Sequence, residues 1–265
     1  MRTVGSSIKP GALAVGVLLA ATALPLHADE IRVMSSGGFA AAYLDLVGPF
    51  ERASSHRVIT DATSTGVGAD SIPSRIRRGD PVDVVILPDA SLNELIKDGR
   101  VMPQSRVPLA RSGIGMAVRA GAPKPDISTV EAFTRAVLQA RSIAYSAQVS
   151  GLYLANELFP RLGIADQVRS KSQVIERERV GAVVARGEAE VGFQQVSELL
   201  PIKGIEFVGP LPAEIQRITL FSAGVATGAG SPEAARALIA FFVSPEGVRA
   251  MTKFRMEPAG PSGRR

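Results

Sequence analysis

Four clusters of small polar residues, spread along the chain, have the chemistry needed to bind an anion. Each cluster follows a run of β-forming residues and precedes a run with helical periodicity. Hydroxyls, amides and glycine N–H groups can donate several hydrogen bonds to one oxyanion or carboxylate, and a helix N-terminus adds the positive end of its dipole. The candidate ligand-binding residues are Ser35, Ser36, Gly37, Gly38, Ser64, Thr65, Ser150, Gly151, Gln194 and Gln195.

The residues that the chain lacks exclude several other kinds of site. It has no cysteine and two histidines, His27 and His56, so disulfides, thiol nucleophiles, thiolate metal sites and histidine-rich metal sites are not expected. No glycine loop leads into Gly-Lys-Ser/Thr or has the G-x-G-x-x-G spacing. No G-x-S-x-G elbow is present. We therefore predict neither a metal nor a cofactor.

The composition describes an ordinary globular protein without a nucleic-acid partner. The 265 residues are 46% hydrophobic and 21% charged, which is typical of a folded chain. The formal net charge is +5, but the basic residues are scattered, and the chain has no tryptophan on which bases could stack. We expect a monomer whose partner is a small anion.

The N-terminus has the layout of a secretory signal peptide. Residues 1–28 contain Arg2 and Lys9, then an apolar stretch over 11–26, and no acidic residue. Leu26-His27-Ala28 places a small residue before a plausible cleavage point, and Asp29 opens a polar segment. We predict cleavage after Ala28 and a periplasmic mature protein.

From residue 31 onward, short β-rich runs alternate with amphipathic runs. This alternation is typical of strands joined by crossover helices, with mainly parallel central sheets. Asp89 is expected to cap a helix, and Gln194 and Gln195 to follow a strand directly. The expected strands are 31–34, 57–62, 82–87, 113–119, 142–145, 190–193 and 218–226. The expected helices are 39–53, 69–78, 128–140, 152–162, 180–186 and 232–242, with another from 245 and one that Asp89 caps.

The arrangement predicts an α/β protein of two lobes joined by two crossings. Residues 29–112 with 222–265 form the first lobe in this interpretation, and residues 113–221 form the second. Parallel sheets bind ligands beyond the carboxyl ends of their strands. We therefore expect the polar clusters to face a cleft between the lobes.

The ordered segments S-S-G-G-F, T-S-T-G, G-D-P-V-D-V-V-I, S-G-L-Y and G-E-A-E-V-G-F-Q-Q resemble the periplasmic molybdate-binding protein family over nearly the whole mature chain. The resemblance implies a type II periplasmic binding protein that delivers a small oxyanion to the membrane subunits of an ABC importer. It also implies anion contacts from Ser64 or Thr65 and from Ser150-Gly151.

Two positions depart from that family's pattern. Gly38 stands where the family has a first-loop serine, and Gln195 stands where it has a tyrosine. A larger carboxylate ligand is therefore an alternative to a molybdate-like oxyanion, with Ser35 or Ser36 supplying the missing hydroxyl. The superfamily also contains aconitate isomerase, which is the alternative function. Its reaction needs a base that removes an allylic proton, for which Tyr145, Glu176 and Glu178 are candidates.

Overall fold

The computed structural model describes residues 1, 5 and 28–260. The predicted signal peptide, residues 1–28, therefore lies almost wholly outside the described residues. Among the helices that are described, none combines the length and the apolar character needed to cross a membrane. The first strand begins at Glu30, just after the predicted cleavage point.

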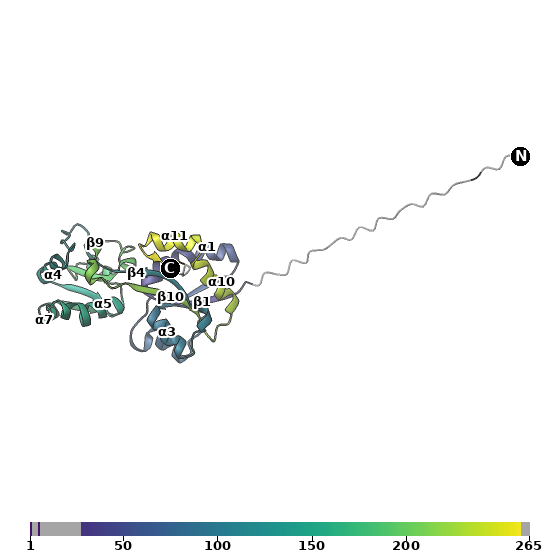
Figure 1. Cartoon of the computed structure of the whole chain (residues 1–265), viewed down its shortest axis with the longest axis horizontal. Helices are drawn as coiled ribbons and strands as arrows, with labels where there is room; N and C mark the ends of the chain where they lie inside the picture. Colours follow the sequence, from purple (N-terminus) through teal and green to yellow (C-terminus); the bar gives the residue numbers. More distant parts are fainter. Residues whose placement is uncertain (2–4, 6–27, 261–265) are drawn as a thin grey trace.

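The described strands form two sheets, one in each of two lobes (Figure 1). The lobe I sheet has the order β11-β4-β10-β3-β1-β2, and the lobe II sheet has the order β7-β6-β8-β5-β9. The predicted α/β class is confirmed. The strands are β1 Glu30–Ser35, β2 Arg57–Ala62, β3 Val84–Pro88, β4 Val107–Ser112, β5 Ile114–Arg119, β6 Ile143–Ser146, β7 Ser172–Ile175, β8 Val191–Gln195, β9 Ile205–Pro210, β10 Thr219–Val225 and β11 Glu257–Pro258.

Helices cover both faces of each sheet, which buries the apolar side chains of the strands on both sides. In lobe I, α1, α10 and α11 pack on one face, and α2 and α3 pack on the other. In lobe II, α4 to α7 cover one face and α8 covers the other. The helices are α1 Gly37–Ser54, α2 Ile72–Arg78, α3 Asp89–Lys97, α4 Val130–Gln139, α5 Val149–Tyr153, α6 Phe159–Arg161, α7 Ala165–Arg169, α8 Val180–Ala185, α9 Val196–Leu199, α10 Pro232–Phe242 and α11 Pro245–Lys253.

The strands that precede the polar clusters are parallel to their neighbours. β1 pairs in parallel with β2 and β3, and β6 pairs in parallel with β7 and β8. The strands next to the lobe crossings, β10 and β5, pair antiparallel with their neighbours instead. Both sheets therefore contain parallel and antiparallel pairs. Antiparallel strands such as β10 and β5 need no crossover helix to reach their neighbours.

Two crossings connect the lobes, at Gly113 between β4 and β5 and at 211–218 between β9 and β10. Gln216 ties them together, since its Oε1 accepts from the Ile114 N–H at 2.7 Å and its Nε2 donates to the Ile114 carbonyl at 2.9 Å. The division of the chain into two lobes at 112/113 and 221/222 stays a prediction.

Three local predictions were wrong in detail. The helix expected over 152–162 is broken by a π-helical turn, Leu154–Leu158, between α5 and α6. Gln194 and Gln195 do not follow their strand but are the last residues of β8. Asp89 is not a cap: it is the first residue of α3, and its carboxylate accepts from Arg106 Nε at 2.8 Å and from the Ser222 hydroxyl at 2.6 Å.

Candidate functional site

A cavity of about 190 Å³ lies where the carboxyl ends of β1, β2, β6 and β8 meet. Residues of both lobes line it, as expected for a ligand site at the ends of parallel strands. Two of the predicted residues, Ser35 and Gly151, do not line it. The predicted residues that do are Ser36, Gly37, Gly38, Ser64, Thr65, Ser150, Gln194 and Gln195.

The N-terminus of α1 supplies the lobe I floor of the cavity. Ser36 is the N-cap residue, yet its hydroxyl makes no capping bond. The side chain is 2% exposed, and Ser36 Oγ has no hydrogen-bond partner among the described residues. A buried hydroxyl without a partner is costly, so a ligand oxygen at this place would satisfy it. Ser35, by contrast, donates to the Ser36 carbonyl at 3.1 Å and does not line the cavity.

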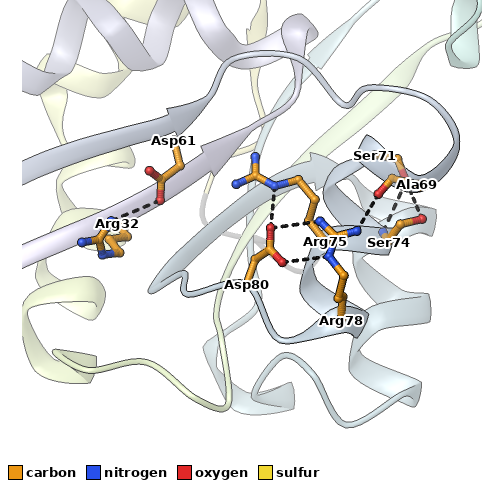
Figure 2. A network of polar contacts seen from close by, with 8 residues as sticks. All are labelled: Arg32, Asp61, Ala69, Ser71, Ser74, Arg75, Arg78 and Asp80. Carbon is orange, nitrogen blue, oxygen red and sulfur yellow. Dashed lines mark hydrogen bonds and ion pairs between the residues drawn. The ribbon is translucent and has the colours of Figure 1, made fainter.

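The loop after β2 brings Ser64 and Thr65 to the cavity mouth. The loop is anchored to α2, because the Ile72 N–H donates to the Thr65 carbonyl at 2.7 Å. Figure 2 shows the polar network around α2, in which Arg78 donates to the Ala69 carbonyl at 3.0 Å and both Arg75 and Arg78 pair with Asp80. The Ile72–Thr65 hydrogen bond thus connects the loop after β2 to the start of α2.

The turn between β6 and α5 supplies the lobe II side. The Ser146 and Ser150 hydroxyls lie 3.1 Å apart, and both residues are 2% exposed. Gln148 reaches across to lobe I, where its Nε2 donates to the Gly66 carbonyl at 2.8 Å. Gly151 lies behind this turn, and a Cβ there would be 1.7 Å from the Ser146 carbonyl oxygen. Only glycine therefore fits at this position, and a ligand contact of Gly151 stays a prediction.

The two glutamines line the cavity, but their side-chain amides have protein partners. Gln194 Oε1 accepts from the Val180 N–H at 3.0 Å, and Gln194 Nε2 donates to Glu198 Oε1 at 3.0 Å. The Gln195 amide faces the lobe crossings, with its oxygen accepting from the Thr219 hydroxyl at 2.9 Å and its nitrogen donating to the Gly113 carbonyl at 3.1 Å. Both side-chain amides therefore hold neighbouring protein groups in place.

The sequence analysis missed a buried carboxyl group, that of Glu198 on α9. Glu198 lines the cavity and is 8% exposed. Burial raises the pKa of this carboxyl to about 7, although Arg179 and the Gln194 amide act in the opposite direction. A carboxyl with such a pKa holds a proton part of the time at neutral pH, which suits proton transfer.

Two cations from the segment before α8 also line the cavity, and the sequence analysis missed them too. No ion pair between described residues involves Arg177 or Arg179. The neighbouring Glu178 is different, because Arg186 binds its carboxylate through two bonds of 2.8 and 2.9 Å. This pairing lowers the pKa of Glu178, so Glu178 is a poor base. Tyr145 does not line the cavity, whereas Glu176 does.

Comparisons with known proteins agree with this architecture. Residues 31–257 match the family described as bacterial extracellular solute-binding protein. An aconitate isomerase of a Pseudomonas species is 43% identical over 236 residues, which cover 88% of this chain and 90% of that protein. The molybdate-binding protein ModA of Azotobacter vinelandii is 28% identical over 193 residues, 71% of each chain.

Solved structures show the same fold at low sequence identity. The periplasmic molybdate-binding protein of Azotobacter vinelandii superposes with a TM-score of 0.70 and 21% identity, covering 85% of this chain and 98% of that one. The sulfate-binding protein SubI of Mycobacterium tuberculosis superposes with a TM-score of 0.68 and 18% identity, covering 89% of this chain and 88% of that one. The predicted resemblance and the periplasmic-binding-protein fold are thereby confirmed. The chain belongs to the bacterial extracellular solute-binding protein family.

Proposed function

We propose that the protein is an aconitate isomerase, which moves the double bond of this tricarboxylate. The observation that carries the proposal is the similarity to an aconitate isomerase at 43% identity over 88% of the chain. Identity at this level along nearly the full length includes both lobes and the segments that line the cavity. The sequence alone had left this function as the alternative to solute capture.

The chemistry of the cavity supports a substrate with several carboxylates. Arg177 and Arg179 provide positive charge, and arginine binds carboxylates through paired hydrogen bonds. Ser36 and Ser150 provide hydroxyls from opposite lobes. Glu198 provides a group that can exchange a proton near neutral pH. A receptor that only binds an anion has no need for a buried acid beside it.

Proton NMR of cis-aconitate incubated with the purified protein tests the proposal. The vinyl and methylene signals of the trans isomer are expected to grow until the two isomers reach equilibrium, and the same final ratio is expected from trans-aconitate. The protein after heat denaturation serves as the control. Spectra that stay unchanged at micromolar protein over hours would contradict isomerase activity.

Solute capture for an ABC importer is the second candidate function. It is supported by family membership and by the similarity to a molybdate-binding protein. A receptor would bind its anion without changing it, so thermal-shift measurements with molybdate, tungstate and tricarballylate separate the two. Stabilisation by molybdate together with unchanged aconitate spectra would favour the receptor.

Export to the periplasm, with cleavage after Ala28, fits either function. The family is an extracellular one, and the first strand, β1, begins at Glu30, two residues after Ala28. Mass spectrometry of the exported protein is expected to show Asp29 as its first residue. An intact Met1 on the exported form would contradict cleavage.

A further inference from the structure

We propose that Glu198 is the acid–base residue that carries the proton in the isomerisation. This inference rests on the proposed function and assigns the step to one side chain. The other ionisable groups considered for the step are less suitable. Glu176 lines the cavity but is exposed to solvent, whereas Glu198 is buried. Tyr145 lies outside the cavity lining, and Glu178 is bound by Arg186. His56 is also outside the lining, and it instead lies beside Asp29.

The position of the Glu198 carboxyl points to contact with a bound ligand. Its Oε1 lies over the N-terminus of α1, so close that a Cβ on Gly37 would be 2.1 Å away. The hydroxyl without a partner, that of Ser36, belongs to the same helix N-terminus. A ligand carboxylate that accepted from Ser36 and the first N–H groups of α1 would therefore lie beside Glu198.

The surroundings hold this carboxyl in one orientation. The Val180 N–H fixes the Gln194 amide at 3.0 Å, and this amide in turn donates to Glu198 Oε1 at 3.0 Å. The α9 helix that carries Glu198 is fastened to lobe I, because Ser197 Oγ donates to the Gly38 carbonyl at 2.6 Å.

One charged side chain and two hydrogen-bond donors act on the Glu198 carboxyl. From the segment before α8, Arg179 acts on the carboxyl, while β8 contributes the Gln194 amide and the Gln195 N–H. The α1 side contributes Gly37, which has no side chain. Burial outweighs these polar groups and raises the pKa of Glu198 to about 7, so that both the carboxylate and the acid are populated in neutral solution.

The proposed step balances without any other reactant. In aconitate a methylene group adjoins the double bond, and both carry carboxylates. The Glu198 carboxylate removes a methylene proton, and the C–H electron pair forms the new double bond. The electron pair of the old double bond moves toward the carboxylate on the vinyl carbon, which gives a dienolate. The Glu198 acid then returns a proton to the former vinyl carbon. The negative charge that develops on the substrate is stabilised by Arg177 and Arg179.

The decisive variant is Glu198→Gln, which keeps the size of the side chain and an oxygen for the Gln194 amide. We expect isomerisation to fall about 10³-fold, while the affinity for tricarballylate, a saturated analogue, changes only a few-fold. The matched control is Glu214→Gln, which removes an exposed carboxyl and should isomerise at the wild-type rate. Wild-type turnover should also depend on a group that titrates near pH 7.

The outcomes separate this inference from the proposed function. Active wild-type protein with a Glu198→Gln variant within tenfold of it would overturn the role of Glu198 alone. Inactive wild-type protein would overturn the proposed function and the assignment with it. If Glu198→Gln does not bind tricarballylate because it fails to fold, Glu198→Asp decides: a lower kcat with little change in KM supports the role, and a wild-type kcat contradicts it.

Discussion

Replacing Gly151 with alanine is expected to destabilise the protein by about 3 kcal/mol or more, because the new methyl group has no room. A Cβ at this position would lie 1.7 Å from the Ser146 carbonyl oxygen and 2.9 Å from the Ser146 nitrogen. Backbone atoms cannot move aside as the end of a flexible side chain can. The turn that joins β6 to α5 would therefore have to shift, and Ser150 would move with it.

Urea unfolding followed by circular dichroism measures this effect. Gly228→Ala is the matched control, since a Cβ on Gly228 meets no atom within 4 Å, and it should unfold close to the wild-type midpoint. The same comparison made with tricarballylate present should show a smaller stabilisation for Gly151→Ala than for the wild type. Equal midpoints for both variants would show that the turn has more freedom than the structure indicates.

Glu198 is expected to make the stability of the protein fall as the pH rises. Burial raises the pKa of this carboxyl from an ordinary 4.5 to about 7. Between these two values the folded state retains a proton that the unfolded state has lost, so the free energy of unfolding decreases with pH across this window. The contribution is complete below the lower value and is lost once the pH passes the higher one. The integrated loss is on the order of 3 kcal/mol.

The difference between wild type and Glu198→Gln isolates this contribution. The variant has no titrating group at this position, so its advantage in free energy of unfolding over the wild type should grow from about pH 5 to about pH 8. Urea titrations at several pH values in this window provide the measurement. A constant difference between the two proteins would mean that Glu198 is ionised throughout, and a shrinking difference would mean that its pKa is lowered by folding.

Much of the fold follows from local signals in the sequence. β2 matches the predicted range of 57–62, and Gly79 ends α2 in the left-handed conformation that favours glycine, with φ of 95°. At the start of α11 the Ser244 side chain accepts from the Gly247 N–H at 3.3 Å, as a serine cap does. Each of these features depends on residues a few positions apart, which a single sequence displays.

Features that depend on distant partners were harder to predict. β4 contains Pro108 and β9 contains Pro210, and proline weakens the strand signal of a sequence. Both segments are strands because β10 pairs with β4 and β5 pairs with β9. The π-helical turn inside 152–162 likewise has no clear local signal. Tertiary pairing decides these segments, so their sequences alone do not specify them.

The residues of the site also divide into those with a local signal in the sequence and those without one. Ser36, Ser64 and Ser150 were identified because strand ends in α/β sheets collect small donors near helix starts. Glu198 and Arg179 were missed, because a glutamate in a short helix and an arginine in a charged run look like solvated surface residues. Their chemistry arises from burial and from neighbours far along the chain. Nothing local shows that the Gln195 amide binds Thr219 and Gly113, and the ligand contact of Gln195 stays a prediction.

Calorimetric titration with tricarballylate tests most directly whether groups from both lobes surround one polycarboxylate. The wild type should bind it at a single site, and both Ser36→Ala from lobe I and Arg179→Gln from lobe II should weaken binding by about tenfold or more. Arg169→Gln, which removes an exposed arginine paired with Asp166, should bind as the wild type does. Unaltered affinity in both cavity variants, or no binding by the wild type, would contradict the shared site.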